Sequence, residues 1–327
     1  MRWPFLLLSL LVANTSWAQA GEPAPEKQPP GAAAPSAGDA PLAPADRPAP
    51  GTPGVPAAVS ATPPAPPAEP SWPAHGIPWV GTWDIVATGG LAAAAVTVEF
   101  VIPSPTVPKW TAQNGFDTGI RDALRLGTDS GRATAGTMSD VLVYLLMAAP
   151  FLNATLVAGI EHERWDVAWR LMVLDAETIL LATTITLSLQ KATARERPYV
   201  QECGNPSPPS QCSSGGKYTS FPSGHTTAAF AAVALECFHH GYLDTSHTGW
   251  GGAVCPVTIV AALGTGILRI AADRHWATDI LVGGAIGGLV GYAVPALHLL
   301  GAEKKTGPVV LPTISPSTVG LTLAGRF

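Results

Sequence analysis

The chain has 327 residues, of which 47% are hydrophobic and 13% are charged. A net charge of −5 without a basic cluster argues against nucleic-acid binding. The mean hydropathy is +0.25 although a long proline-rich stretch lowers it, and this value favours a membrane protein over a soluble one.

Residues 1–20 have the pattern of a bacterial secretory signal. A positive charge at Arg2 precedes a short apolar run from Phe5 to Ala13, and the small-x-small sequence Ala18-Gln19-Ala20 follows. We expect cleavage after Ala20, which places the mature chain in the cell envelope of a bacterium. An uncleaved membrane anchor is the alternative.

Residues 21–75 have a composition of their own. Proline and alanine dominate this segment, it holds more than half of the chain's 33 prolines, and large apolar residues are scarce. Such a segment cannot bury a core, so we expect a disordered linker between the signal peptide and a folded domain.

Residues 76–300 carry the apolar segments that predict the folded domain. Most approach the length of about twenty residues that crosses a bilayer, and they predict an all-α bundle of about six helices embedded in a membrane. A soluble periplasmic helical domain is the alternative. The segments are Trp83–Ile102, Val141–Ala158, Leu171–Leu189, Thr226–Phe238, Ala253–Ala272 and Asp279–Leu300.

The C-terminal tail, residues 301–327, differs from the helical part. Val319, Leu321 and Leu323 alternate with other residues, which is the period of a β-strand, and a second run at Val309–Ile314 precedes them. We therefore expect a short β-like tail, either a hairpin of these two runs or a loose surface segment.

Three polar segments lie among the apolar ones and predict a phosphate site. Arginine offers a planar fork of donors to phosphate oxygens, which suits Arg197 and Arg269 to binding them. Ser223 suits a helix N-cap before an apolar run, where the first-turn N–H groups at Gly224 attract an anion. The segments are Arg197-Pro198, Pro222-Ser-Gly-His225, and the run from Arg269 through His275 to Asp279.

Two histidines in these segments suit the two roles that phosphoryl transfer requires: a nucleophile that bonds to phosphorus and an acid that protonates the leaving oxygen. If the residues from Ala272 onward are helical, His275 and Asp279 share one face, and the carboxylate fixes the tautomer of the ring. His275 is then the nucleophile, forming a phosphohistidine that water hydrolyses. No such carboxylate follows His225 in the sequence, which favours His225 as the general acid.

These residues resemble the type 2 phosphatidic acid phosphatase and vanadium haloperoxidase superfamily, whose motifs are Lys-x6-Arg-Pro, Pro-Ser-Gly-His and Ser-Arg-x5-His-x3-Asp. The resemblance covers about residues 141–300, the motif core. It implies an all-helical fold, His275 as nucleophile oriented by Asp279, and His225 as acid. It also implies phosphate binding by Arg197 and Arg269.

The chain departs from the family pattern at two positions. Leu268 replaces the serine before Arg269, and the position of the first-motif lysine falls on Gln190. Lys191 is one residue closer to Arg197, and on a helix that shift turns the side chain by about 100°. Lys191 therefore reaches the phosphate only if the helix ends or bends there.

Four cysteines bear on the compartment. Cys203 and Cys212 bracket a short loop beside the predicted site, a separation that a disulfide bridges easily in an oxidising compartment. Cys237 and Cys255 either form a second bridge between successive helices or are two buried thiols. These residues favour a site outside the cytoplasm.

The order in which the apolar segments would cross a membrane favours a cytoplasmic site instead. If the N-terminus is translocated and all six segments cross, the Arg197 motif lies in the cytoplasm, and the basic residues between Lys109 and Arg132 agree with that. An extracytoplasmic site requires either that Trp83–Ile102 packs without crossing or that the domain is soluble. We adopt that choice, which makes the segment Asp117–Asp140 a polar helix or surface connection.

The predicted function is a metal-independent phosphatase at the periplasmic side of the inner membrane, acting on a phosphomonoester or pyrophosphate. A phosphorylated lipid is the favoured substrate and a small phosphoester the alternative; no cofactor is required. Three alternatives stay open: a soluble periplasmic acid phosphatase, a haloperoxidase with vanadate on His275, and a non-catalytic envelope scaffold. The sequence does not indicate an oligomeric state.

Overall fold

A computed structural model describes residues 78, 80–213, 215–243, 251–302, 309–315 and 318–324. The predicted signal peptide and linker, residues 1–75, lie outside the described residues. The chain divides into two units, residues 1–64 and 65–327, and everything described below belongs to the second.

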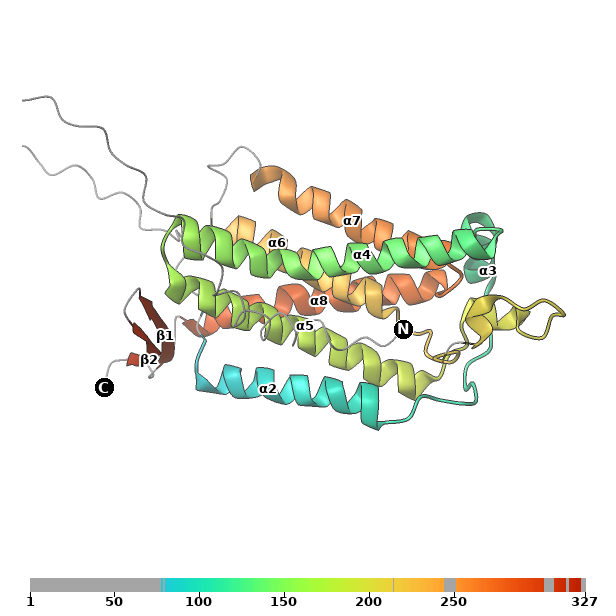
Figure 1. Ribbon diagram of the computed structural model, residues 1–327, viewed down its shortest axis with the longest axis horizontal. Coiled ribbons are helices and arrows are strands. Elements are labelled where there is room, and N and C mark those ends of the chain that lie inside the picture. Colours follow the sequence, from blue (N-terminus) through green and yellow to red (C-terminus); the bar gives the residue numbers. More distant parts are fainter. Residues whose placement is uncertain are drawn as a thin grey trace, which may run out of the picture. The chain divides into compact units, whose positions relative to one another are not determined.

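Long helices make up most of the described domain (Figure 1). The elements in chain order are α2 (Thr82–Val96) with its π-helical continuation η1 (Thr97–Val101), α3 (Gly115–Leu124), α4 (Asp129–Asn153) with its π-helical continuation η2 (Ala154–Glu161), α5 (Trp165–Thr193), the 3-10 segments η3 (Pro198–Glu202) and η4 (Ser210–Ser213), α6 (Gly224–Leu243), α7 (Gly251–Ala271) and α8 (Ala277–Ala302). The all-α bundle predicted from the apolar segments is confirmed.

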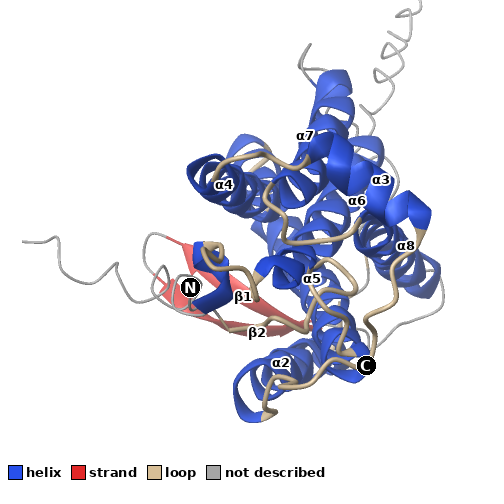
Figure 2. Cartoon of the chain, turned by 90° about the vertical axis from the view of Figure 1, so that its right-hand side faces the viewer, coloured by secondary structure: helices blue, strands red, loops and turns tan. Residues whose placement is uncertain are grey.

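Helix α6 lies inside the bundle, and α2 lies outside it against α5. The view along the helices shows α4, α5, α7 and α8 around α6 (Figure 2). Successive long helices run in opposite directions. Short connections join η2 to α5 and α7 to α8, the end of α5 contacts the start of α6 through the bond of Gln190 to Pro222, and a disulfide joins Cys237 near the end of α6 to Cys255 near the start of α7. The C-terminal ends of α2, α5 and α7 therefore meet the N-terminal ends of α4, α6 and α8 at one end of the bundle.

Glycines on one face of α8 allow it to pack closely against α6. A Cβ atom built on Gly283 would lie 2.7 Å from the carbonyl oxygen of Ser223, and one on Gly287 would lie 2.2 Å from that of Thr227. Gly291 continues the row one turn later, where an added Cβ would lie 2.6 Å from the Cβ atom of Ala234. This small-xxx-small spacing is typical of membrane helices, and it brings the start of α8 against the start of α6.

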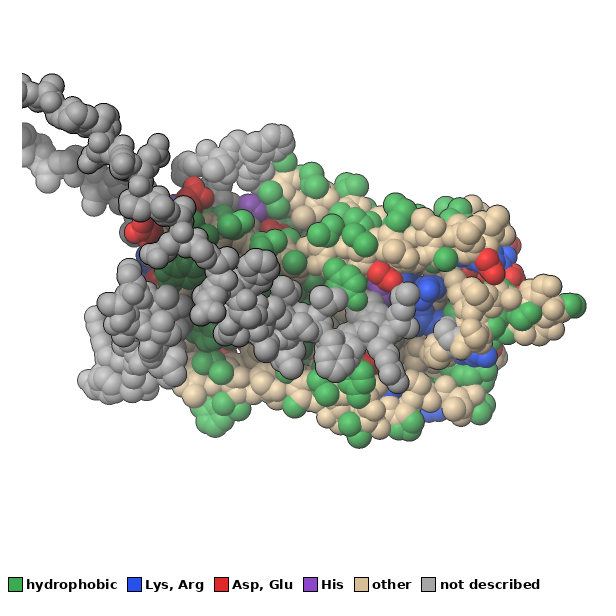
Figure 3. Space-filling view, in the orientation of Figure 1, with side chains coloured by type: hydrophobic (Ala, Val, Ile, Leu, Met, Phe, Trp, Pro, Cys, Tyr) green, Lys and Arg blue, Asp and Glu red, His purple; other side chains and the backbone are tan. Residues whose placement is uncertain are grey.

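The outer surface of the helices is apolar, as a membrane requires. Five helical segments are long and apolar enough to cross a bilayer: Thr82–Val101, Asp129–Glu161, Trp165–Thr193, Gly252–Ala271 and Ala277–Leu299. Large hydrophobic side chains are exposed along them, among them Leu145, Val260 and Leu289 (Figure 3). Packing inside the protein does not account for all of these apolar residues, because none of the apolar window in Thr82–Val101 is buried inside the protein.

Asp175 is a charged group inside a helical segment that faces the bundle interior, whereas Glu99 of η1 is exposed. Asp175 of α5 is fully buried, and its Oδ1 lies 3.0 Å from Nε2 of His239 in α6. Pairing of this kind is what an ionisable residue requires when lipid surrounds the helix.

One boundary differs from expectation. Helix α7 ends at Ala271 and α8 begins at Ala277, so His275 lies in a turn and not on a helix with Asp279. Of the two forms expected for Asp117–Asp140, a polar helix or a surface connection, the structure has mainly the helical one, because the segment contains most of α3 and the first three turns of α4. Segment Thr82–Val101 has the length and composition of a membrane span, so nothing in its form requires it to stay outside the bilayer.

The two runs of the C-terminal tail form an antiparallel hairpin. Strand β1 (Val309–Ser315) pairs with β2 (Thr318–Ala324), with Val309 opposite Ala324 and Ser315 opposite Thr318. The β-like tail predicted from the alternation is present.

Candidate active site

The three polar segments meet at the end of the bundle where α5 ends and α6 and α8 begin. Arg197 stands before η3, His225 is in the first turn of α6, and Arg269 is in the last turn of α7. His275 lies in the turn from α7 to α8, and its Nε2 is 3.2 Å from Nη1 of Arg197. Segments separated widely in the sequence therefore share one buried site.

The ring of His275 is held through one nitrogen and leaves the other for chemistry. Its Nδ1 lies 2.7 Å from the carbonyl oxygen of Ser220, and since a carbonyl only accepts, Nδ1 carries the proton. The lone pair is then on Nε2, facing Arg197. Burial, followed by the charges of Arg197 and Arg269, lowers the pKa of His275 well below that of a free imidazole. The ring is therefore neutral, which is the nucleophilic form.

Asp279 acts on His275 mainly through its neighbours. Its Oδ2 is 3.6 Å from Nδ1 of His275, longer than a hydrogen bond. The carboxylate instead accepts hydrogen bonds from the hydroxyl of Ser220 at 2.6 Å, the backbone N–H of Trp276 at 2.9 Å and the guanidinium of Arg195 at 2.5 Å. The direct carboxylate–imidazole bond expected from helical spacing is replaced by a carboxylate that fixes the segments around the ring.

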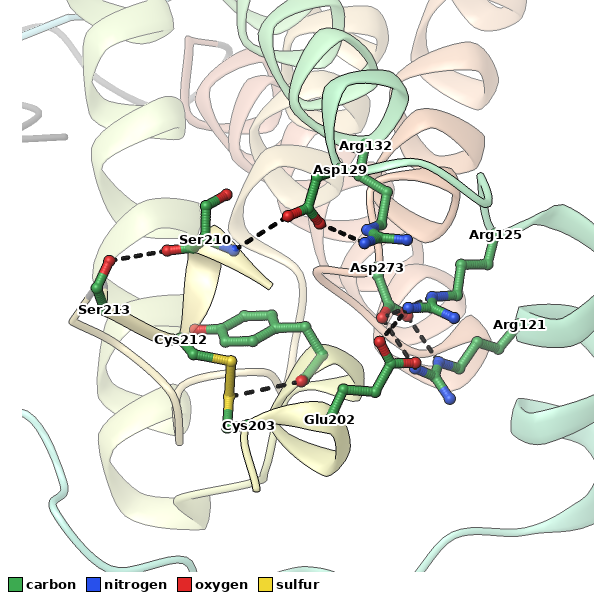
Figure 4. The surroundings of a disulfide bond; sticks show 11 residues. Arg121, Arg125, Asp129, Arg132, Glu202, Cys203, Ser210, Cys212, Ser213 and Asp273 are labelled. Atoms are coloured by element: carbon green, nitrogen blue, oxygen red, sulfur yellow. Dashed lines mark hydrogen bonds and ion pairs between the residues drawn. A yellow bond between two sulfur atoms is a disulfide. The ribbon is translucent and has the colours of Figure 1, made fainter. Parts of the chain in front are cut away.

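Ion pairs fix the turn that carries His275. Asp273 has a φ of 59°, in the left-handed region, and is fully buried. It accepts hydrogen bonds from Arg121 at 2.6 and 2.8 Å and from Arg125 at 2.9 Å (Figure 4). Both arginines also reach Glu202 of η3. Helix α3 thereby ties the histidine turn to the segment after Arg197.

A disulfide lies beside this ion-pair cluster. Cys203 is bonded to Cys212, with 5.5 Å between their Cα atoms, and the bond closes the loop after η3 (Figure 4). A second disulfide joins Cys237 of α6 to Cys255 of α7, with 4.8 Å between Cα atoms. Cys237 is near the C-terminal end of α6, so the second disulfide belongs to the other half of the bundle.

Arg197 is placed for anion binding because neutral groups hold it. Its Nε donates to the carbonyl oxygen of Gly216 at 2.8 Å, and Nη2 donates to that of Thr219 at 3.1 Å. Nη1 donates to the carbonyl oxygen of Arg274 at 3.0 Å. Carbonyl oxygens orient the guanidinium without cancelling its charge. Burial lowers the pKa of Arg197, and the charge of Arg274 lowers it further.

Arg269 approaches the same site from α7 and is held by α4. Its Nη1 donates to Oδ1 of Asp140 at 3.0 Å and to the hydroxyl of Ser139 at 3.2 Å. The buried Nε of Arg269 has no hydrogen-bond partner among the described residues. Arg269 therefore keeps donor capacity for an anion.

The start of α6 completes the anion-binding geometry. Ser223 directly precedes the helix, and its buried hydroxyl accepts the backbone N–H of Thr226 at 3.5 Å, the N-cap position predicted for it. The first-turn N–H groups of Gly224 and His225 have no acceptor within the helix, as at any helix start. They lie at the positive end of the α6 dipole.

His225 has a carboxylate partner that the sequence spacing did not reveal. Oδ1 of Asp140 in α4 is 2.7 Å from Nε2 of His225. The expected absence of a carboxylate partner for His225 is therefore not found, and its place beside Arg269, which binds the same carboxylate, still suits an acid. The only signal for Asp140 in the sequence is its place directly before the apolar run that starts at Val141.

Neither nearby basic residue of the first motif faces the site. Lys191 turns outward and donates to the carbonyl oxygens of Ile102 and Glu99. Arg195 is buried between two carboxylates, with 2.6 Å to Asp117 and 2.5 Å to Asp279, and stacks on Trp110 at 4.1 Å. The predicted phosphate contact of Lys191 is not formed.

Gln190 occupies the inward position one residue before Lys191. Its Nε2 donates to the carbonyl oxygen of Pro222 at 2.8 Å, and a Cβ on Gly224 would lie 3.5 Å from the same nitrogen. The position that a lysine holds in the family motif therefore carries a neutral amide against the Pro222–His225 turn.

One group of potential metal ligands is present in the described part of the chain, and it is elsewhere. Asp84, Glu177 and His298 come from α2, α5 and α8, with their ligand atoms within 4.8 Å of one another. Asp84 begins α2 and His298 is near the end of α8, which places the group at the end of the bundle away from His275.

Comparisons with known proteins agree with the motifs. Residues 173–300 match the model of the PAP2 superfamily. A segment of 77 residues, 24% of this chain, is 46% identical to "Lipid A 1-phosphatase" of Porphyromonas gingivalis, and the match covers 16% of that protein.

One solved structure matches part of this chain. It is the first transmembrane PAP2 type phosphatidylglycerolphosphate phosphatase from Bacillus subtilis, with a TM-score of 0.42 and 18% sequence identity over 68% of this chain and 97% of that chain. The family match to residues 173–300 contains all three polar segments, from Arg197 to Asp279. This helical region of the chain is therefore similar to the PAP2 superfamily.

Proposed function

We propose that this chain is a metal-independent phosphatase that hydrolyses a phosphomonoester or pyrophosphate through a phosphohistidine on His275. One observation carries the proposal: Nδ1 of His275 is bonded to the Ser220 carbonyl while Nε2 lies 3.2 Å from Arg197. A neutral imidazole thus presents its lone pair where an arginine can hold the phosphoryl group.

In the first step Nε2 of His275 attacks phosphorus, and the bond from phosphorus to the leaving oxygen breaks. His225 donates a proton to that oxygen. Burial, followed by the charge of Arg269, lowers the pKa of His225 to about 3 in the protein without substrate, so the ring holds the proton only when a second anion lies beside it. Asp140 supplies one negative charge at 2.7 Å, and the substrate supplies the other. Arg197, Arg269 and the start of α6 stabilise the equatorial oxygens.

In the second step water attacks phosphorus, and the bond to Nε2 of His275 breaks. His225 takes a proton from the water as it attacks, which restores the acid for the next cycle. Inorganic phosphate leaves, and His275 returns to its neutral form. No step requires a metal ion, because the arginines and the helix dipole balance the charge.

A phosphorylated lipid is the proposed substrate. The site lies at the end of a bundle whose outer faces are apolar, so a lipid in the bilayer meets the site at the membrane surface. The partial match to a protein described as a lipid A 1-phosphatase supports the same substrate class. The head group is left open.

We propose that the site end of the bundle faces the periplasm, supported by the Cys203–Cys212 disulfide beside it. Because the long helices alternate in direction, a periplasmic site places the start of α2 on the cytoplasmic side if all of them cross. A cleaved signal peptide at residues 1–20 is incompatible with that arrangement.

An accessibility experiment tests this orientation. Single cysteines are introduced at exposed sites of a variant in which all four natural cysteines are serine, one at Ser130 beside the site and one at Glu161 in the opposite connection. In intact cells a membrane-impermeant maleimide should label the cysteine at 130 and leave that at 161 unlabelled. The reverse pattern would overturn the periplasmic site.

The activity is tested by phosphate release from a short-chain phosphatidic acid with chelator present, by protein purified in detergent. Wild type should release phosphate, His275→Ala should not, and Lys191→Ala should match wild type. Acid-labile, alkali-stable radiolabel should be trapped on wild type alone. A folded protein that releases no phosphate from a panel of phosphoesters would contradict the phosphatase, and halide oxidation with added vanadate and peroxide would then indicate a haloperoxidase.

A further inference from the structure

The site contains a place for a cation that the expected residue does not fill. Gln190 has the inward position of the first-motif lysine, and its amide is bonded to the carbonyl oxygen of Pro222 at 2.8 Å. Lys191 faces Ile102, and Arg195 is neutralised by Asp117 and Asp279. Neither of them can supply a positive charge to a substrate phosphate without losing its present contacts.

Arg274 is the remaining cation near His275, and it directly precedes the nucleophile. A Cβ built on Gly136 of α4 would lie 3.3 Å from Nε of Arg274 and 3.6 Å from Nη2. The guanidinium therefore packs against α4 one turn before Asp140, which binds Arg269 and His225. Any larger residue at position 136 would displace it.

The charge of Arg274 is not balanced by a carboxylate. No ion pair of its guanidinium is found among the described residues, and its buried Nε has no hydrogen-bond partner there. By contrast, Arg121, Arg125 and Arg269 each have a carboxylate within 4.0 Å. A guanidinium with unused donors and an uncancelled charge suits a tetrahedral oxyanion.

The charges of the site are consistent with an anion that draws the arginines together. Arg269 lies close enough to Arg274 and Arg197 for both to repel it. Repulsion from Arg274 also adds to the effect of burial in lowering the pKa of Arg197. Asp140 offsets part of this positive charge at Arg269, and Asp279 offsets part of it at Arg197. A bound phosphoryl dianion would offset the rest.

We propose that Arg274 binds the substrate phosphoryl group in place of the missing first-motif lysine, so that the cation comes from the residue before the nucleophile instead of the end of α5. The inference rests on the proposed phosphatase function for its substrate, a phosphate ester. The geometry that carries it is independent of turnover: a guanidinium that packs against α4, has no ion pair among the described residues and belongs to the residue before His275.

Binding of orthovanadate, measured by calorimetry on the purified full chain, tests the proposal without requiring activity. Arg274→Ala should weaken vanadate binding by about 10- to 100-fold, the effect of losing a charged hydrogen bond. Arg274→Lys should retain most of the affinity. Lys191→Ala, which removes a cation of the same segment that faces away, should bind as wild type does.

A double variant tests whether a lysine at position 190 can replace the cation at position 274. In the double variant Gln190→Lys with Arg274→Ala, the new lysine should recover at least about a tenth of the wild-type affinity for vanadate. The same ranking should appear in KM for a short-chain phosphatidic acid. Thermal unfolding and gel filtration of each variant establish that the comparison is between folded proteins.

Two results would overturn the inference. One is wild-type vanadate affinity in folded Arg274→Ala; the other is a loss in Arg274→Ala that Gln190→Lys leaves uncorrected, which would show that the two positions do not serve one role. A wild type that binds vanadate in the predicted ranking yet hydrolyses no phosphoester would contradict the proposed function and leave the binding role of Arg274 supported.

Discussion

Oδ1 of Asp140 lies 2.7 Å from Nε2 of His225 and 3.0 Å from Nη1 of Arg269. One carboxylate of α4 thus orients both the proposed acid in α6 and a phosphate-binding arginine in α7. Asp140 does not need to touch the substrate to matter, because it sets the position of two groups that do.

Asp140→Asn should lower kcat by about 10- to 100-fold, since an orienting partner of a catalytic imidazole contributes on that scale. The rate should fall more than KM rises, because Arg197 still binds phosphate. Steady-state kinetics on a short-chain phosphatidic acid measures both. Asp129→Asn changes a half-exposed carboxylate of the same helix and is the control; equal effects of the two substitutions would contradict a specific role for Asp140.

The neutral state of His275 predicts the acid side of the pH profile. Burial, Arg197 and Arg269 lower the pKa of His275, so the unprotonated nucleophile persists below the free-imidazole value of about 6.5. We expect kcat/KM to stay near its maximum as the pH falls through that value. A profile that halves at about 6.5 would indicate an ordinary imidazole.

The same shift predicts how stability depends on pH. Below about 6.5 the unfolded chain binds a proton at His275 that the folded protein excludes, so the free energy of unfolding should decrease as the pH falls. His275→Asn should show a shallower decrease. Thermal unfolding in detergent between neutral and mildly acidic pH measures the difference, and parallel curves for the two proteins would contradict the buried neutral ring.

Close packing of α8 on α6 predicts unequal effects at two adjacent glycines. A Cβ on Gly287 would lie 2.2 Å from the carbonyl oxygen of Thr227, whereas one on Gly288 meets nothing within 4 Å. Gly287→Ala should therefore destabilise the protein by about 1–3 kcal/mol, and Gly288→Ala should be neutral or slightly stabilising. Thermal unfolding of both variants tests this. Equal melting temperatures would show that α8 does not pack as described.

The ion pairs at Asp273 predict a large effect of one charge. Asp273→Asn keeps the size of the side chain and tolerates the φ of 59°, but it leaves Arg121 and Arg125 without their buried counterion. We expect destabilisation of about 3 kcal/mol. Asp166→Asn, which breaks the exposed pair with Arg164, should cost under about 1 kcal/mol. Denaturation curves in detergent compare them, and a ratio near one would contradict the burial of the cluster.

The amino-acid sequence determined the fold class and the residues that carry the chemistry. Apolar segments of membrane length specify helices, and the spacing within Pro222–His225 and Arg269–Asp279 specifies side chains whose chemistry is local. Arg197 belongs to the same set because Pro198 keeps it in extended backbone directly before η3. These features are visible in sequence because each depends on residues that are near one another in the chain.

Tertiary structure decided which partner each of these residues has. The bond of His275 goes to Ser220, 55 positions away, and that of His225 goes to Asp140, 85 positions away. Helix α5 continues past both residues to Thr193, so Gln190 faces the site and Lys191 does not. The packing of α4 against the histidine turn left Arg274 without a counterion. Such contacts depend on how helices pack across the bundle, and no local spacing in the sequence encodes that packing.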